Sequence, residues 1–138
     1  MRIMVSACLL GENCKYDGGN NYSRKVAEFI EGHQVISVCP EELGGLSTPR
    51  VPSEIVEGVV TARDGKCVDE EFRRGAGLAL ERALLERAEL VILQSRSPSC
   101  GAKRIYDGTF SGKTIEGQGI FARLLRENGF RVMDVEDL

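Results

Sequence analysis

The sequence predicts an α/β protein with a three-layer, Rossmann-like fold: a mostly parallel sheet of about four strands, helices on both faces, and a small inserted β-hairpin. Two observations lead to this prediction. Short apolar runs without polar alternation, such as residues 3–5 and 90–93, are typical of parallel strands buried on both faces. Stretches with helical periodicity separate these runs, so that strands and helices alternate along the chain. We expect residues 1–138 to form a single α/β domain.

The first part of the chain alternates strand, helix and strand. Residues 3–5 form the first expected strand, and a helix is predicted at residues 24–31, where Ser23 supplies an N-cap. The second strand is expected at residues 35–39. Three of the four prolines fall within residues 40–52, so this segment is predicted to be an irregular, stiff loop.

The next element is a small β-hairpin, predicted for residues 55–62 and 66–68. The turn is placed at residues 63–65, because Asp64 and Gly65 form a pair that favours tight hairpin turns. Four more elements then alternate helix and strand, at residues 70–88, 90–93, 119–128 and 131–135. The first of these is the longest, and its apolar residues recur at the spacing of a helix that packs against a sheet.

Composition and charge narrow the classes of function. The formal net charge of −3 gives no reason to expect tight binding to nucleic acid or to acidic membranes. No apolar run approaches the roughly 20 residues that cross a bilayer, and residues 1–8 are interpreted as a strand rather than a signal segment. The five cysteines are odd in number and lack the dense spacing of secreted disulfide scaffolds, which favours a reducing cytoplasm.

Three cysteines form the pattern that points most directly to chemistry. Cys8, Cys39 and Cys100 each come shortly after an expected strand. Ligands of parallel α/β sheets bind outside the carboxyl ends of the strands, so the three thiols are expected to meet at one site. Thiolates suit iron–sulfur clusters and zinc, although the Cys-x-x-Cys pairs of many structural zinc sites are absent from the sequence. The alternative is that Cys8 and Cys39 are small buried hydrophobic residues. Cys100 fits that alternative poorly, because it lies in a polar turn.

Further side chains are candidates for the same site. Glu41, two residues after a strand-end cysteine, is expected to act beside a metal as general base or acid, or else to be an exposed loop residue. Ser97 is a candidate for donating a hydrogen bond or moving a proton, although serines beside proline are also common in turns. Arg50 is expected to grip a substrate carbonyl or phosphate, or to form an ion pair. Cys14 is either a fourth ligand or nearby thiol, or a loop cysteine packed under its turn, and Cys67 is expected to be structural.

A set of short motifs extends these candidates over almost the whole chain. They are VSACLLG (5–11), CKYDG (14–18), CPE (39–41), GGL (44–46), PR (49–50), SPSCG (97–101) and YDGTF (106–110). In this order they resemble a widespread bacterial family, long catalogued as a domain of unknown function, whose characterised members include thiouracil desulfidases.

The resemblance implies an oxygen-sensitive [4Fe-4S] cluster held by three cysteines, which correspond to Cys8, Cys39 and Cys100. The fourth iron is then free to bind the sulfur of the substrate. The resemblance also implies catalytic roles for Glu41, which activates water, and for Ser97, which assists proton transfer or orients the base. The implied reaction is a non-redox removal of sulfur from a small thiolated nucleobase such as 2- or 4-thiouracil, giving uracil and sulfide.

Other hypotheses stay open at this stage. A sulfur carrier with a persulfide on a reactive cysteine such as Cys100 needs no iron, and is therefore colourless where an iron–sulfur protein is brown. A non-catalytic metal-binding module is expected to keep its metal and its binding function after Glu41→Ala. Action on thiolated bases in RNA is disfavoured by the acidic charge balance, although Lys15, Arg24 and Lys25 are candidates for a local basic patch.

Overall fold

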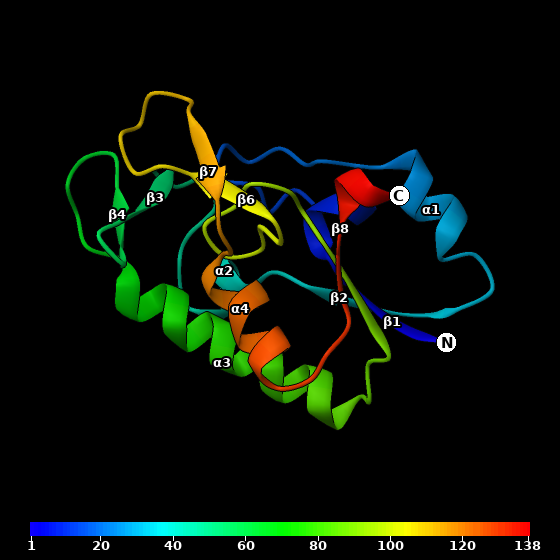
Figure 1. Ribbon diagram of the computed structural model, residues 1–138. Coiled ribbons are helices and arrows are strands. Elements are labelled where there is room, and N and C mark those ends of the chain that lie inside the picture. The colour runs from blue at the N-terminus through cyan, green and yellow to red at the C-terminus, as the bar shows by residue number, and fades with distance from the viewer.

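Four parallel strands form the centre of the protein. In the computed structural model, which describes residues 1–138, they lie in the order β2-β1-β5-β8 (Figure 1). Their bounds are Gln34–Val38 for β2, Arg2–Ser6 for β1, Leu90–Leu93 for β5 and Val132–Asp134 for β8. The two middle strands, β1 and β5, carry the apolar runs of the sequence, and β5 is buried throughout. The predicted mostly parallel sheet is confirmed.

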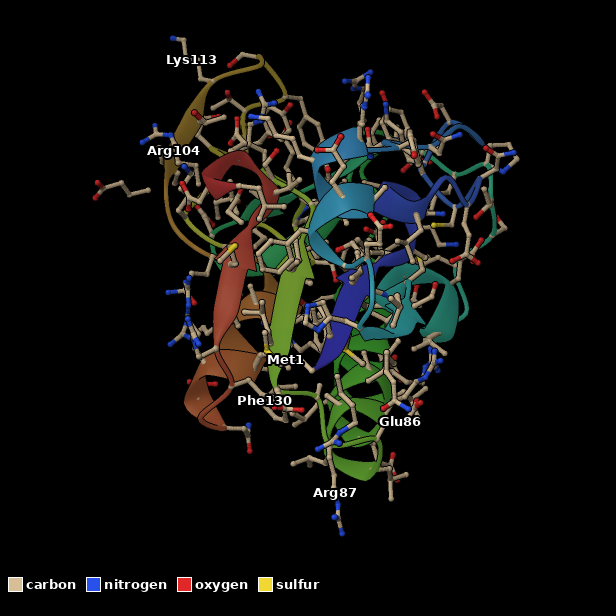
Figure 2. The ribbon with its side chains drawn as sticks, turned by 90° about the vertical axis from the view of Figure 1, so that its right-hand side faces the viewer. Met1, Glu86, Arg87, Arg104, Lys113 and Phe130 are labelled. Atoms are coloured by element: carbon tan, nitrogen blue, oxygen red, sulfur yellow. The ribbon has the colours of Figure 1, made fainter.

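Helices cover both faces of this sheet. On one face lie α3 (Asp69–Leu85) and α4 (Ile120–Glu127), which pack on a core that includes Met4 and Val91. On the other face lie α1 (Arg24–Phe29) and the short 3-10 helices η1 (Ala7–Leu10) and η2 (Val135–Asp137). Figure 2 views the sheet from the α1 side, with α3 and α4 behind the strands. The predicted three layers are therefore confirmed.

Outside the first hairpin, the predicted helices and strands are present, with ends that differ from expectation by a few residues. Ser23 caps α1 as expected, because its hydroxyl accepts a hydrogen bond from the Val26 N–H at 3.2 Å. The helix predicted at residues 70–88 begins at Asp69 and ends at Leu85. None of the helices combines the length and apolar character needed to cross a membrane.

The segment predicted as an irregular loop, residues 40–52, begins instead with a helical turn, α2 (Pro40–Leu43). Proline suits the first position of a helix, because its missing N–H has no partner there in any case. The α2 backbone touches that of α3 at two glycines. A Cβ atom on Gly75 would lie 1.8 Å from the Pro40 carbonyl oxygen, and one on Gly44 would lie 2.0 Å from the Glu71 carbonyl oxygen. Glycine at these two positions therefore allows the contact that holds α2 in place.

Two antiparallel hairpins complete the fold, and one differs from its prediction. In the first hairpin β3 (Ser53–Val56) pairs with β4 (Val59–Ala62) around Glu57 and Gly58, whose φ angles are 51° and 79°. The predicted turn at residues 63–65 is a second turn, after which Cys67 makes only an isolated bridge to Thr61. The second hairpin, β6 (Arg104–Tyr106) with β7 (Thr114–Glu116), was not expected from the sequence.

Candidate metal-binding site

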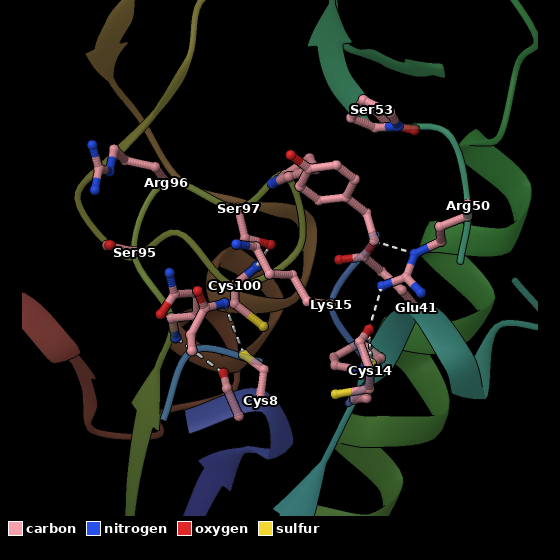
Figure 3. Close-up of a pocket in the computed structure, with 18 of the residues that line it drawn as sticks. Cys8, Cys14, Lys15, Glu41, Arg50, Ser53, Ser95, Arg96, Ser97 and Cys100 are labelled. Atoms are coloured by element: carbon pink, nitrogen blue, oxygen red, sulfur yellow. Dashed lines mark hydrogen bonds and ion pairs between the residues drawn. The ribbon is translucent and has the colours of Figure 1, made fainter. Parts of the chain in front are cut away.

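The three cysteines that follow strands line one cavity of about 440 Å³ at the carboxyl edge of the sheet. Cys8 lies in η1 directly after β1, Cys39 directly follows β2, and Cys100 lies in the loop after β5. Because β2, β1 and β5 are neighbours in the sheet, the three cysteines follow three adjacent strands. Connections leave β1 and β5 in opposite directions, which makes the crevice between these strands the usual ligand site of an open parallel sheet. Two groups of side chains face each other there (Figure 3): Cys8, Cys100 and Ser97 on one side, and Glu41, Arg50 and Cys14 on the other.

Ser97 fixes the loop that carries Cys100. Its hydroxyl oxygen accepts hydrogen bonds from the N–H groups of Ser99 and Cys100, both at 3.0 Å. The start of α4 supports the same loop, because the Phe121 N–H donates to the Ser99 carbonyl at 2.9 Å. Gly119 allows this approach, since a Cβ atom there would lie 2.5 Å from the Ser99 carbonyl oxygen. Since the Ser97 oxygen is the acceptor in both bonds, its hydroxyl proton is available to donate to another group. Ser97 lines the cavity.

Two polar side chains that the sequence did not single out contact the thiols. The Asn21 side-chain amide donates a hydrogen bond to the Cys8 sulfur at 3.5 Å. Burial raises the pKa of the Cys8 thiol, and this hydrogen bond opposes the rise. Burial also raises the pKa of the Cys100 thiol, and there the opposing hydrogen bond comes from Ser6. Ser6 and Asn21 thus favour sulfur in its anionic form. The only feature of the sequence that pointed to Ser6 was its place in the first motif, two residues before Cys8.

Cys14 lies under its loop, and it also lies beside Cys39. It is buried, and its Sγ atom, the Cys39 Sγ atom and a carboxylate oxygen of Glu42 are all within 4.8 Å of one another. A hydrogen bond between the two thiols raises the pKa of Cys14, with burial adding to the rise, and lowers the pKa of Cys39. Cys14 is therefore part of the cavity wall rather than a remote packing residue. Cys67 is exposed, comes after the first hairpin and lies apart from the cavity lining.

Glu41 and Arg50 form an ion pair in the cavity wall. The Arg50 Nε–H group donates to a Glu41 carboxylate oxygen at 3.1 Å, and the two side chains are only 8% and 19% exposed, Arg50 being the more buried. Burial raises the pKa of the Glu41 carboxyl, although the Arg50 charge opposes this rise. Arg50 also donates to the Cys14 carbonyl at 2.8 Å and to the Thr48 hydroxyl at 2.9 Å. Of the two roles expected for Arg50, the ion pair is the one observed.

The cavity lining also includes aromatic and cationic side chains. These residues, which the sequence analysis did not single out as a set, are Lys15, Tyr16, Arg63, Arg96, Tyr106 and Phe110. The loop that carries Phe110 is held by Glu54, whose buried carboxylate accepts hydrogen bonds from the N–H groups of Gly108 at 2.9 Å and Phe110 at 3.1 Å. Aromatic faces of this kind suit a flat heterocycle.

The chemistry of the donor set fits an iron–sulfur cluster. The three strand-end thiols are not engaged in disulfides and converge on one cavity, and the Cys8 sulfur accepts a hydrogen bond from Asn21. Iron–sulfur clusters are held by cysteine thiolates, and hydrogen bonds to sulfur are among the features that adjust their properties.

Three comparisons with known proteins each found a match over almost the whole chain. A sequence profile of the family described as "2-thiouracil desulfurase" matches residues 3–137. A protein of Bacillus subtilis (strain 168), named "Uncharacterized protein YbbK", is 42% identical over an alignment 147 positions long. The alignment covers 99% of this chain and 97% of that protein. A solved structure of a "[4Fe-4S]-dependent thiouracil desulfidase TudS" is 40% identical and superposes with a TM-score of 0.93, covering 99% of this chain and 92% of that one.

Proposed function

The chain belongs to the 2-thiouracil desulfurase family, and from this premise we propose that it removes sulfur from a small thiolated heterocycle, using a [4Fe-4S] cluster held by Cys8, Cys39 and Cys100. The observation that carries the proposal is the meeting of three thiols from three adjacent strands in one cavity, which Glu41 and Ser97 also line. An oxygen-sensitive cluster of this kind agrees with the reducing cytoplasm expected from the cysteine content.

Three protein thiolates leave one iron of such a cluster without a protein ligand. When bound, the cluster would supply a soft Lewis-acidic iron that attracts a thiocarbonyl sulfur. The remaining work falls to the side chains of the cavity. Tyr16, Tyr106 and Phe110 offer apolar surfaces for the flat ring of the substrate, which supports binding of a nucleobase-sized molecule.

Glu41 is the proposed general base. Its raised carboxyl pKa makes it a stronger proton acceptor than a solvent-exposed glutamate, and the Arg50 ion pair fixes its orientation. Glu41 takes a proton from a water molecule, whose oxygen forms a bond to the carbon that carries the sulfur. The carbon–sulfur bond then breaks, so that the carbon keeps the water oxygen as a carbonyl and the sulfur leaves as sulfide. No atom changes its oxidation level, and the reaction is a hydrolysis.

Ser97 is proposed to assist the proton transfer. Its oxygen is already engaged by two backbone N–H groups, so its proton is the part of the hydroxyl that remains to interact with a molecule in the cavity. A donor at this position can orient the attacking water or the departing sulfur. The same side chain therefore has two tasks, holding the Cys100 loop and directing one hydrogen bond.

The test is anaerobic reconstitution with iron and sulfide, followed by iron analysis and an assay for conversion of thiouracil to uracil. Cys8→Ala, Cys39→Ala and Cys100→Ala should each lose the cluster and the activity, whereas Cys67→Ser, the matched control at an exposed cysteine, should keep both. Glu41→Gln should keep the iron but lose about 10²- to 10⁴-fold in kcat, the usual range for a general base. Full iron content and turnover in Cys100→Ala would refute the ligand assignment.

The same experiment separates the rival functions. A colourless protein that transfers sulfur without iron would point to a persulfide carrier. A protein that holds iron but shows no desulfuration, and whose binding is unaffected by Glu41→Gln, would point to a metal-binding module without catalysis.

A further inference from the structure

The proposed cluster ligands leave one buried thiol of the cavity without a role. This thiol is Cys14, and its Sγ atom, the Cys39 Sγ atom and a Glu42 carboxylate oxygen all lie within 4.8 Å of one another. Two thiols and a carboxylate are a donor set suited to a tetrahedral, thiophilic divalent cation. We propose that Cys14, Cys39 and Glu42 form a second, mononuclear metal site that takes a cation such as Zn²⁺.

The donor groups are held in place by a surrounding network. The Cys14 N–H donates to the Glu12 carbonyl at 2.9 Å, and the Cys14 carbonyl accepts from Arg50 at 2.8 Å. The Glu42 carboxylate accepts from the Thr48 hydroxyl at 2.6 Å, and Arg50 donates to that hydroxyl at 2.9 Å. Carboxylates that bind metals are commonly oriented by such outer hydrogen bonds. Arg50 takes part on both sides of the site, because it donates to the Cys14 carbonyl and to the Thr48 hydroxyl.

The distances suit a single ion better than a larger cofactor. Zinc lies about 2.3 Å from sulfur and about 2.0–2.2 Å from oxygen, so the donors of a tetrahedral site stand less than 4.8 Å apart, as these three donor atoms do. Both cysteines also line the cavity, so an ion held by them would be reached from it.

Cys39 belongs to both donor sets, so the zinc site and the cluster exclude each other. The exclusion rests on the proposed function, because it requires Cys39 to be a cluster ligand. The zinc site itself does not rest on it. A zinc-loaded protein is therefore a distinct state that is unable to assemble the cluster until the zinc is removed.

Metal-free protein titrated anaerobically with Co²⁺ and then Zn²⁺ tests the site. Wild type should bind one equivalent, with the thiolate-to-cobalt absorption and visible bands of tetrahedral coordination. Zinc affinity from competition with a chromogenic chelator should fall about 100-fold in Cys14→Ser and about tenfold in Glu42→Gln. Cys67→Ser is the matched cysteine control and should bind as wild type does.

Two variants separate this site from the cluster. Cys14→Ser should take up as much iron as wild type on reconstitution, whereas Cys100→Ser should lose iron uptake but keep the cobalt spectrum and the zinc affinity. Unchanged zinc binding in both Cys14→Ser and Glu42→Gln would overturn the proposal, as would loss of zinc binding in Cys100→Ser. Glu42→Gln lies on the surface, so its result does not depend on how well a buried cysteine tolerates replacement.

The mutual exclusion of zinc and the cluster can be measured directly. Wild type loaded with zinc should take up little iron, and Cys14→Ser treated in the same way should take up iron normally. If zinc binds through Cys14 but the zinc-loaded wild type still gains full iron without releasing zinc, Cys39 is not shared. That result would overturn the exclusion and one of the two assignments of Cys39, and iron uptake and zinc affinity of Cys39→Ala then show which one.

Discussion

Arg50 connects groups that come from three separate parts of the chain. Its guanidinium group makes four hydrogen bonds, to Glu41, Ser47, Thr48 and the Cys14 carbonyl. The planar fork of a guanidinium group can serve several acceptors at fixed angles, whereas a lysine ammonium group at the end of a flexible chain cannot hold the same set. The geometry of Glu41 therefore depends on this one side chain.

The change Arg50→Lys tests that dependence. It keeps the positive charge but loses the fork, so kcat for desulfuration should fall about 10- to 100-fold, as is usual for groups that orient a site from behind. Iron content should remain that of wild type, and KM should change less than kcat. Steady-state kinetics with iron analysis measures this. Arg24→Lys is the matched control, because Arg24 also pairs with a glutamate, Glu28, but on the exposed surface of α1. Equal kinetics in Arg50→Lys and wild type would contradict the orienting role.

Among single residues, the sequence pointed to those that follow strands. It did not point to residues that reach the site from other parts of the chain. Cys8, Cys39 and Cys100 were found because a parallel sheet gathers its strand ends. Asn21 and Glu54 were missed because an asparagine in a polar loop and a glutamate in a hairpin have no local signal. Their roles depend on hydrogen bonds across 13 residues for Asn21 and 54 residues for Glu54.

At the scale of elements, the contact between α2 and α3 determines where the chain after Cys39 lies. Gly75→Ala would place a Cβ atom 1.8 Å from the Pro40 carbonyl oxygen, so α2 must shift. We expect a loss of about 1–3 kcal/mol in the free energy of unfolding, together with reduced activity, because Glu41 lies in α2. Urea denaturation measures the first effect. Gly77→Ala in the same helix has no atom within 4 Å of the added Cβ, and it should stabilise the protein by about 0.5–1 kcal/mol. Similar effects from the two changes would refute the close contact.

Asp69 joins α3 to the first hairpin. Its carboxylate accepts from the Val60 N–H at 3.0 Å and from Arg73 at 2.7 Å. Burial opposes ionisation, but these bonds outweigh it and lower the pKa of Asp69. A carboxyl whose pKa is lower in the folded than in the unfolded chain stabilises the fold above its unfolded pKa of about 3.9, and this stabilisation is lost as pH falls through the folded pKa. Asp69→Asn should therefore cost about 1 kcal/mol at pH 7, and the gap to wild type should close in acid. Urea unfolding curves of Asp69→Asn and wild type at pH 7 and at acidic pH measure the difference in the free energy of unfolding. A difference that persists unchanged in acid would show that ionisation of Asp69 is not its cause.

The hairpin shows why the limits of elements are harder to predict than their existence. Asp64 and Gly65 have the residue types preferred in a tight turn, so the sequence placed the hairpin turn there. The strands turn instead at Glu57 and Gly58, both with positive φ, where a glutamate is an unusual choice. Asp64 and Gly65 still lie in a turn, but β3 pairs with β4 ahead of it, and this pairing cannot be seen in a short sequence window.

At the scale of the whole molecule, the alternation of strands and helices was enough to predict the sheet, its layers and the edge that carries the site. The sequence did not fix how closely the strand ends approach, because that depends on the sheet order β2-β1-β5-β8. This order places β1 between β2 and β5. The proposed cluster therefore joins segments that are distant in sequence, Cys8, Cys39 and Cys100, and its binding should be linked to the stability of the whole sheet.

Cluster loading should consequently raise the unfolding temperature. A group that binds the folded but not the unfolded chain stabilises the fold by mass action, and each kcal/mol shifts the midpoint of a domain of this size by about 2–5 °C. We expect the reconstituted protein to unfold roughly 5–10 °C above the metal-free protein, by circular dichroism under anaerobic conditions. Cys67→Ser should show the same shift, because Cys67 lies away from the cavity. Cys100→Ser should show none, since two of the three proposed ligands are insufficient to hold the cluster. A full shift in Cys100→Ser would mean that the stabilising metal is bound elsewhere, and the proposed link between cluster and sheet would fail.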